Sequence, residues 1–436
     1  LFLAGDFLNP SLLGSIKVDG ERVRGKQMIE VMNAMNFDLV AFGNHEFDVS
    51  QKELQMRLNE SNFPWISANI NLKTEKGLTS FYKEINGQKQ PIGKTFIKEF
   101  SDEDGTTIKI GFVSVCIPSN PKDFVVYDDM YEKISSSYES IKDHVDVVFG
   151  LTHATLENDI RIAKLLPNIP LIMGGHEHAH SNDLVGNVQI SKADANAKTV
   201  YIHKITYDKH TGKTSVSSEL KEINSSIKTD KKVGSIVKKW QTILVAQIKN
   251  VIKYPDEVIF EAKTPLDGRD TPIRSVQTNL GQVISKAMSF AFNDKVDCAL
   301  VNGGSIRIDD QLSGPVTAVD IFRVLPYGGG VLKVGIKGEL LERVLNYGVN
   351  ARGQGAYLHR FNAYKVGDQW MIKNKALILN KTYTVAISDY LLKGLDIPFL
   401  TNNNKDITFV FQPKINELAY DIRKVVINYL KKLLFK

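Results

Sequence analysis

Side chains of the types that commonly bind divalent metal ions occur at the ends of four apolar runs in the first half of the chain. They are Asp6, Asn44, His45, His153, His176 and His178. Imidazole nitrogen and carboxylate oxygen suit Zn²⁺, Mn²⁺ or iron. A carboxylate can bridge two ions, and ions about 3.5–4 Å apart stabilise both the attacking and the leaving oxygen of a phosphoryl transfer. These residue types therefore indicate metal-assisted phosphoryl chemistry.

The apolar runs that precede these side chains predict buried strands. One run, at 39–42, ends in Gly43, whose conformational freedom predicts a sharp turn. Two more strands are predicted at 145–149 and 170–173. Open α/β sheets bind their ligands at the carboxyl ends of the strands, so we expect the metal-binding side chains to converge there.

Four motifs in this half resemble those of the calcineurin-like metallophosphoesterases, and the run from Gly43 to Asp48 is similar to their 5′-nucleotidase branch. The motifs are Gly5-Asp6, Gly43-Asn44-His45-Glu46, Thr152-His153 and Gly175-His176-Glu177-His178. The resemblance implies two divalent metal ions, Zn, Mn or similar, which Asp6 bridges. The other ligands that it implies are Asn44, His153 and His176 for one ion and His178 for the second.

The same resemblance implies that His45 and Asp48 form a catalytic pair. A carboxylate at Asp48 can orient the imidazole and stabilise its charge, and the imidazole then supports the developing charge or the leaving group. His180 falls outside the pattern, and we expect it either on the surface or in a supporting position behind the metal ligands.

Members of this family begin with an Asp-x-His strand that supplies most of the second metal site, and no such motif precedes Asp6. Because every later motif is intact, we expect an N-terminally clipped fragment, and a degenerate member is the alternative. Relatives are mostly exported, so the resemblance implies a periplasmic, extracellular or cell-surface location with a signal upstream of Leu1.

A second group of side chains, in the last third of the chain, has the chemistry of a nucleotide clamp. The group comprises Arg274, Asn302, Gly304, Arg307, Tyr327, Tyr390 and Asp396. Arginine suits bidentate phosphate contacts, and glycine lets backbone approach a ligand closely. Stacking between two aromatic rings is worth about 1–3 kcal/mol per base, and an acidic side chain can accept hydrogen bonds from ribose hydroxyls.

The runs Asn302 to Arg307 and Leu325 to Gly329 look like the C-terminal domain of 5′-nucleotidases, in which two arginines and an asparagine hold the substrate. Members often carry Phe at the positions of the two tyrosines, and stacking survives that change. The later loop departs more, because Leu395 and Ile397 stand where glycine is common. Both lack glycine's conformational freedom.

Composition limits the remaining possibilities. The chain has 436 residues, 43% hydrophobic and 24% charged, which is globular composition with room for two or three domains. Its formal charge of +6 is spread without a long basic run, so we expect no nucleic-acid polymer as partner. Two distant cysteines allow neither a disulfide framework nor a cysteine metal motif. No apolar run reaches the roughly 18 residues of a transmembrane helix, and the oligomeric state stays open.

We therefore predict an α/β protein, a metallophosphoesterase αββα sandwich followed by an α/β nucleotide-recognition domain. The predicted boundaries are residues 1–230 for the sandwich, 231–253 for a linker helix and 254–436 for the substrate-binding domain. The predicted function is a two-metal phosphomonoesterase that hydrolyses nucleoside 5′-monophosphates to nucleoside and phosphate. The alternatives are a UDP-sugar hydrolase or 2′,3′-cyclic nucleotide phosphodiesterase, and a non-catalytic nucleotide-binding homologue.

Overall fold

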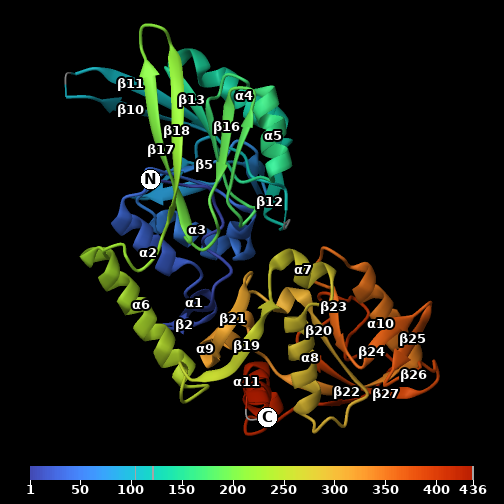
Figure 1. Cartoon of the computed structure of the whole chain (residues 1–436). Helices are drawn as coiled ribbons and strands as arrows, with labels where there is room; N and C mark the ends of the chain where they lie inside the picture. The colour runs from blue at the N-terminus through green and yellow to red at the C-terminus, as the bar shows by residue number, and fades with distance from the viewer. Residues whose placement is uncertain (104, 120–121, 435–436) are drawn as a thin grey trace. The chain divides into compact units, whose positions relative to one another are not determined.

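The computed structural model describes residues 1–103, 105–119 and 122–434. It divides into two units, Leu1–Gln241 and Thr242–Lys436 (Figure 1). The division falls within helix α6 (Lys231–Lys249), inside the segment 231–253 that the sequence predicts as a linker. The last two residues of the predicted second domain, 435–436, lie outside the described residues.

A three-stranded parallel sheet opens the first unit. Its strands, in spatial order, are β1 (Phe2–Leu3), β4 (Leu39–Ala41) and β5 (Trp65–Ile66). Side chains alternate across β4, so Val40 and Phe42 face one side and Leu39 and Ala41 the other. Helices α2 (Lys26–Met35) and α3 (Gln51–Glu60) pack on the side of Val40 and Phe42.

A six-stranded sheet forms the other half of this unit. In spatial order its strands are β10 (Thr95–Ser101), β11 (Thr107–Val113), β13 (Val147–Thr152), β14 (Leu171–Gly174), β16 (Val188–Lys192) and β15 (Ser181–Val185). The four central strands run parallel, and the two edge strands pair antiparallel. Helices α4 (Met130–Ile141) and α5 (Leu156–Leu165) cover one face of this sheet through Ile134 and Ile162.

The two sheets share a core. Leu39 and Ala41 of the small sheet pack with Phe112, Phe149 and Leu171 of the large one. The order of layers is therefore helices, sheet, sheet, helices, which confirms the αββα sandwich that the sequence predicts. The remaining elements are α1 (Leu12–Ser15), β2 (Lys17–Val18), β3 (Glu21–Arg22), η1 (Asn44–Asp48), β6 (Ile70–Thr74), β7 (Gly77–Thr79), β8 (Tyr82–Ile85), β9 (Gln88–Pro91), β12 (Val125–Tyr127), η2 (Lys142–His144), β17 (Thr199–Asp208) and β18 (Lys213–Glu222).

The second unit is built on a five-stranded mixed sheet. In spatial order its strands are β23 (Leu358–Phe361), β20 (Cys298–Asn302), β27 (Thr382–Ser388), β22 (Val331–Lys337) and β28 (Ile407–Phe411). Helix α10 (Gly338–Asn350) packs on the face that carries Cys298 and Leu300. Helix α8 (Asn279–Phe290) lies against β20 and β23, and α11 (Ile422–Leu434) lies against α8. This unit is α/β, as predicted.

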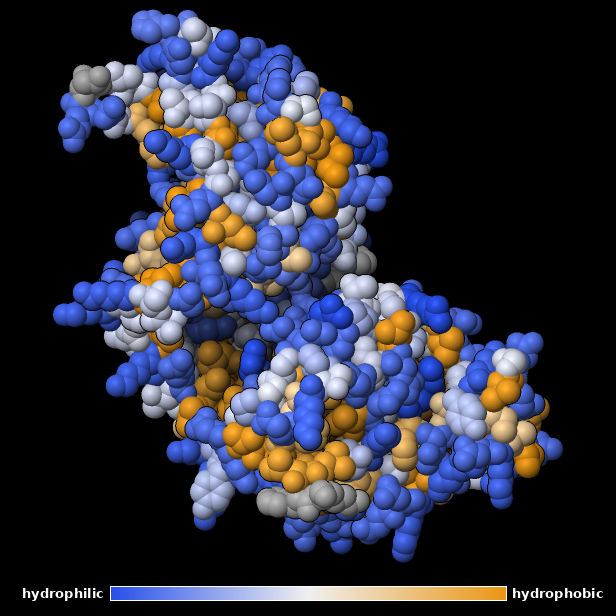
Figure 2. All heavy atoms as spheres, viewed as in Figure 1, coloured by the Kyte–Doolittle hydropathy of each residue, from blue (hydrophilic) through white to orange (hydrophobic). Residues whose placement is uncertain are grey.

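The other elements of this unit surround the sheet. They are β19 (Val258–Asp267), α7 (Asp270–Ser275), η3 (Gly303–Ser305), β21 (Gln311–Thr317), α9 (Ala318–Val324), β24 (Ala363–Val366), β25 (Gln369–Ile372), β26 (Lys375–Ala376) and η4 (Leu418–Tyr420). Across the described residues, no helix combines the length and apolarity needed to span a bilayer. Figure 2 shows that hydrophilic residues cover most of the visible surface, with apolar residues in scattered patches.

Candidate functional site

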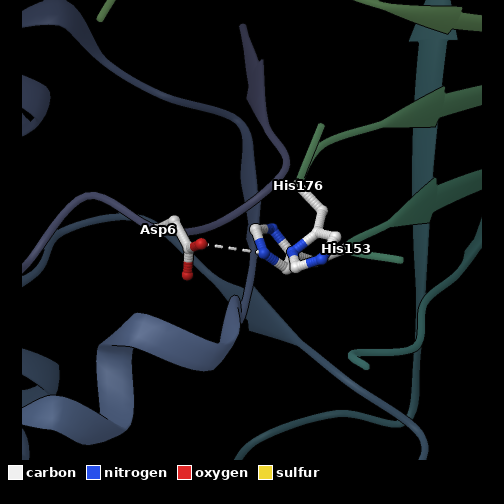
Figure 3. A group of neighbouring side chains, drawn as sticks. All are labelled: Asp6, His153 and His176. Carbon is white, nitrogen blue, oxygen red and sulfur yellow. Dashed lines mark ion pairs between the residues drawn. The ribbon is translucent and has the colours of Figure 1, made fainter. Parts of the chain in front are cut away.

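Three side chains from three strand ends meet at one point of the first unit. Asp6 follows β1, His153 follows β13 and His176 follows β14. One ligand atom from each lies within 4.8 Å of the others, and Figure 3 shows the carboxylate and two imidazoles turned toward one another. The structure therefore gathers residues that are up to 170 positions apart in the sequence.

His153 is held with one nitrogen facing this point. Its Nδ1 lies 2.6 Å from the carbonyl oxygen of Ala4, which only accepts, so Nδ1 carries a hydrogen. Its Nε2 lies 2.9 Å from Oδ2 of Asp6 and 3.1 Å from Oδ1 of Asn44. Asn44 thus joins the group, with an imidazole nitrogen and two side-chain oxygens directed at the same place. A metal-ligating histidine is commonly fixed in this way by a carbonyl on its other nitrogen.

The electrostatics of the group favour a cation. Burial alone would raise the pKa of Asp6, but His153 outweighs it and holds that pKa well below its ordinary range. Burial opposes protonation of His153, yet attraction to Asp6 raises the His153 pKa. Oδ2 of Asp6 is buried and, within the described part of the chain, accepts no hydrogen bond of normal geometry. A divalent ion would satisfy this oxygen, so the residues present fit a metal.

His176 completes the donor set as a neutral imidazole. Burial, and then the charge of His153, lower the pKa of His176 to about 4. The backbone is left-handed at Asp6 (φ 60°), His176 (φ 85°) and His178 (φ 61°). Such conformations cost about 1–3 kcal/mol each and cluster at functional sites. His178 is exposed and lies outside the three-residue cluster, so its assignment to a second ion rests on the resemblance alone.

Glu46 is a functional candidate that the sequence reasoning did not assign. Its carboxylate is fully buried and accepts four backbone N–H groups, those of Asp6, Phe7, Leu8 and Gly43, at 2.6–3.1 Å. Burial, and then the charge of Asp6, raise the pKa of Glu46 to about 7. The available signal was an acidic residue in the first turn after a strand, where it can accept free N–H groups. Glu46 therefore holds the Asp6 loop against η1.

Glycine is required at position 43 for a different reason from the one expected from the sequence. The sequence predicts a sharp turn, but Gly43 has extended backbone with φ −103°. A Cβ at Gly43 would lie 2.2 Å from Oδ1 of Asp6. Glycine is needed here because the two loops approach closely.

His45 and Asp48 are paired as the resemblance implies. Nδ1 of His45 lies 2.7 Å from Oδ2 of Asp48, which also accepts a hydrogen bond from Asn9 at 3.2 Å. The backbone N–H of His45 donates to Oδ1 of Asp6 at 2.7 Å. The pair is therefore connected directly to the candidate metal ligand, and Asp48 determines that Nε2 is the ring nitrogen of His45 that makes other contacts.

A hydrogen-bonded group lies at the carboxyl end of β20 in the second unit. The side chain of buried Asn302 donates to Oδ2 of Asp396 at 2.7 Å, and the Tyr390 hydroxyl donates to Oδ1 at 2.9 Å. Ser305 in turn donates to Oδ1 of Asn302 at 2.6 Å. Burial, and then Asp396, raise the pKa of Tyr390 far above its usual range, and Tyr327 adds to this effect. Both tyrosines are exposed, by 53% for Tyr327 and 36% for Tyr390.

The remaining clamp residues lie on segments that border this group. Arg274, in α7, donates from Nε to Asp270 at 2.7 Å. The backbone N–H of Gly304 donates to the carbonyl of Gly355 at 2.9 Å. The backbone N–H of Arg307 donates to Val324 at 2.9 Å, at the end of the helix that leads to Tyr327.

The loop that carries Asp396 does not need extra glycines. Positive φ occurs at Gly394 (73°), whereas neither Leu395 nor Ile397 has a left-handed backbone. Ile397 is fully buried in the core of this unit. The loop therefore presents the Asp396 carboxylate without the glycines common in the family.

Comparison with known proteins agrees with this geometry. Residues 258–401 match the family model described as the 5′-nucleotidase C-terminal domain. The chain is 26% identical to human (Homo sapiens) 5′-nucleotidase over 370 residues, which covers 76% of this chain and 61% of that protein. It is 25% identical to the trifunctional nucleotide phosphoesterase protein YfkN of Bacillus subtilis (strain 168) over 364 residues, covering 76% of this chain and 24% of that protein.

The chain carries a 5′-nucleotidase C-terminal domain at residues 258–401 and is similar to 5′-nucleotidases over most of its length. Its fold is similar to the crystal structure of a 5′-nucleotidase precursor from Thermus thermophilus, with a TM-score of 0.70 at 21% identity. That likeness covers 100% of this chain and 87% of that one. The chain spans less than two thirds of the human and Bacillus relatives. All seven clamp residues of this chain fall inside the segment that matches the family model.

Proposed function

We propose that the chain is a metal-dependent phosphoesterase that hydrolyses nucleoside 5′-monophosphates to nucleoside and phosphate. The observation that carries the proposal is the convergence of Asp6, His153 and His176 within 4.8 Å. The match of residues 258–401 to the 5′-nucleotidase C-terminal domain, and the similarity to 5′-nucleotidases, support the substrate class.

In this proposal Asp6, Asn44, His153 and His176 hold one divalent ion, and Asp6 and His178 contribute to a second. Bound divalent ions would neutralise charge on the phosphoryl oxygens and assist the attacking and leaving oxygens. The carbonyl of Ala4 keeps the hydrogen of His153 on Nδ1, and Glu46 keeps the Asp6 backbone in place. These two contacts position the ligands.

His45 is proposed to stabilise charge and to exchange protons beside the metal ligands. Asp48 accepts the Nδ1 hydrogen at 2.7 Å, which leaves Nε2 of His45 as the ring nitrogen that would contact the reacting phosphate or its leaving oxygen. An imidazole oriented in this way typically contributes about 10²–10⁴-fold to a rate.

The second unit supplies binding energy away from the reacting phosphorus. Arg274 and Arg307 contact phosphate or ribose oxygens, and Tyr327 and Tyr390 stack on the base. Asp396, which Asn302 holds at 2.7 Å, accepts from the ribose hydroxyls. Such remote contacts improve catalysis when they position the substrate for the transition state.

Phosphate release from AMP, with EDTA-treated protein and added Mn²⁺ or Zn²⁺, tests the proposal. We expect metal-dependent release, and release from no nucleotide would refute it. A parallel panel of UDP-glucose and 2′,3′-cyclic AMP distinguishes the first alternative, which the trifunctional name of the Bacillus relative favours. AMP binding without any hydrolysis would instead support the non-catalytic alternative.

We also propose a periplasmic, extracellular or cell-surface location, as the resemblance implies. Fractionation of the native cells tests it, with the protein expected outside the cytoplasmic membrane. Recovery in the cytosol alone would contradict it.

A further inference from the structure

A buried lysine lies beneath the candidate metal site. Lys192, the last residue of β16, is 1% exposed and lies 2.8 Å from Oδ2 of Asp159, which is 0% exposed. Its ammonium donates to the carbonyls of Ala154 at 2.6 Å and Gly175 at 2.8 Å, and to Oε2 of Glu177 at 2.7 Å. An ammonium has three N–H donors, so these three bonds use all of them.

Both carbonyls belong to residues next to candidate metal ligands. Ala154 follows His153, and Gly175 precedes His176. One ammonium therefore joins the loop after β13 to the loop after β14. The Gly175 carbonyl belongs to the peptide that enters His176, whose backbone is left-handed (φ 85°). Lys192 thus supports the strained peptide that aims His176.

Glu177 closes the same network from the other side. While Oε2 accepts from Lys192, Oε1 accepts the backbone N–H of Leu156 at 2.6 Å, at the start of α5. The two loops are consequently linked twice, once through Lys192 and once through Glu177.

The neighbouring strand is shaped to admit this lysine. Gly174 of β14 pairs in register with Lys192 of β16. A Cβ at Gly174 would lie 2.9 Å from Oδ2 of Asp159 and 3.0 Å from Cε of Lys192. A side chain at 174 would therefore crowd the buried pair.

We propose that Lys192 is a positioning residue that holds His153 and His176 in ligand geometry before a metal ion binds. Burying an ammonium carries a desolvation penalty that ion pairing often only offsets. Its geometric role, tying two loops together, accounts for its place here. The inference rests on the proposed function, in which both histidines are metal ligands.

The test compares four variants of the whole chain with wild type. Lys192→Met combined with Asp159→Asn removes both charges of the buried pair, so that no unpaired carboxylate stays inside. Asp159→Asn alone keeps the three bonds of Lys192. Lys204→Met removes the same charge from an exposed position on β17. Glu177→Gln, at a side chain 29% exposed, serves as a second probe if the double variant fails to fold.

Two measurements are made, Mn²⁺ affinity by calorimetry and hydrogen exchange of the metal-free chain. In the double variant we expect the Mn²⁺ Kd to rise about 10- to 100-fold, the usual effect of losing a partner that orients metal ligands. We also expect faster exchange in peptides covering 153–158 and 174–180. Asp159→Asn and Lys204→Met should leave both quantities within about twofold of wild type, and Glu177→Gln should weaken Mn²⁺ binding by a smaller factor.

A double variant that binds Mn²⁺ as tightly as wild type, with unchanged exchange, overturns the inference. If the double variant is unfolded, unchanged Mn²⁺ binding in Glu177→Gln overturns it. If wild-type protein binds Mn²⁺ but releases no phosphate from any nucleotide, the proposed function is overturned. The Mn²⁺ affinities and exchange rates of the variants still test the role of Lys192 in that case. Wild-type protein that binds neither Mn²⁺ nor Zn²⁺ overturns both.

Discussion

The carboxylate of Glu46 accepts the backbone N–H of Asp6 at 2.7 Å, and the charge of Asp6 in turn contributes to the raised pKa of Glu46. Two acidic residues are therefore held together in a buried site, one as a candidate metal ligand and the other as its support. The Glu46 carboxylate also holds a second loop, because it accepts the backbone N–H of Gly43 at 2.6 Å. The strand ends that carry Asp6 and His45 are joined through this one side chain.

Glu46→Gln should destabilise the first unit. An amide keeps one acceptor oxygen, so two of the four backbone N–H groups lose their partner in a buried place. Each such loss costs about 1–3 kcal/mol, and we expect the free energy of unfolding to fall by about 3 kcal/mol. Chemical denaturation of metal-free protein measures it. Glu75→Gln, at an exposed position, is the control and should change stability by less than about 0.5 kcal/mol.

His45→Gln should lower kcat for AMP by about 100-fold or more and leave Mn²⁺ affinity within a few-fold. The side chain acts on charge and protons, whereas the proposed ligands lie elsewhere. His180→Gln is a matched control, because His180 also pairs with a carboxylate, Asp194 at 3.0 Å, but is exposed. Steady-state kinetics with metal titration measures both. Equal loss in the two variants would contradict the assigned role.

Tyr390→Leu should raise the KM for AMP by about 10-fold or more and change kcat little. The ring is proposed to stack on the base, worth about 1–3 kcal/mol. Tyr390→Phe keeps the ring and loses only the hydroxyl bond to Asp396, so its KM should rise by less than about fivefold. Tyr364→Leu removes a similarly exposed tyrosine on β24 and should leave KM unchanged. A KM for Tyr390→Leu equal to wild type would remove the stacking role.

His359 should make the second unit sensitive to acid. Its Nε2 donates to the carbonyl of Ile273 at 2.8 Å, and burial lowers the pKa of His359 to about 4. The unfolded chain binds a proton near pH 6.5, so stability is present above that pH and is lost as the pH falls toward 4. Between pH 7 and pH 5 this group should remove about 2 kcal/mol of unfolding free energy.

The comparison of His359→Gln with wild type isolates this contribution. Between pH 7 and pH 5, the free energy of unfolding of the His359→Gln variant should fall by about 2 kcal/mol less than that of wild type. Calorimetry of the whole chain measures both. His210→Gln, at an exposed turn, should follow the wild-type pH dependence. Parallel curves for wild type and His359→Gln would show that burial does not hold this imidazole neutral.

The fold class was predictable because strands and helices can be recognised in the sequence by the periodicity of their apolar residues. The run at 39–42 indicates a buried strand, and β4 (Leu39–Ala41) lies there. The periodicity does not show which elements pack against each face of the strand. Leu39 faces the second sheet and Val40 faces the helices, which is decided by which elements pack together.

The candidate site was predictable to the extent that its chemistry lies in side-chain types. Asp6, His153 and His176 are recognisable because few residue types bind metal, and the structure brings them together. Lys192 was not recognisable, since two of its acceptors are backbone carbonyls that every residue possesses. Gly43 was noticed for the wrong reason, because close approach of two loops depends on tertiary structure.

An anomalous difference map at the zinc edge, from a crystal of the protein grown with Zn²⁺, tests the central claim most directly. The account predicts a peak that lies about 2.0–2.2 Å from a carboxylate oxygen of Asp6 and from one ring nitrogen each of His153 and His176. A map with zinc bound elsewhere, and no peak between these three side chains, would contradict it.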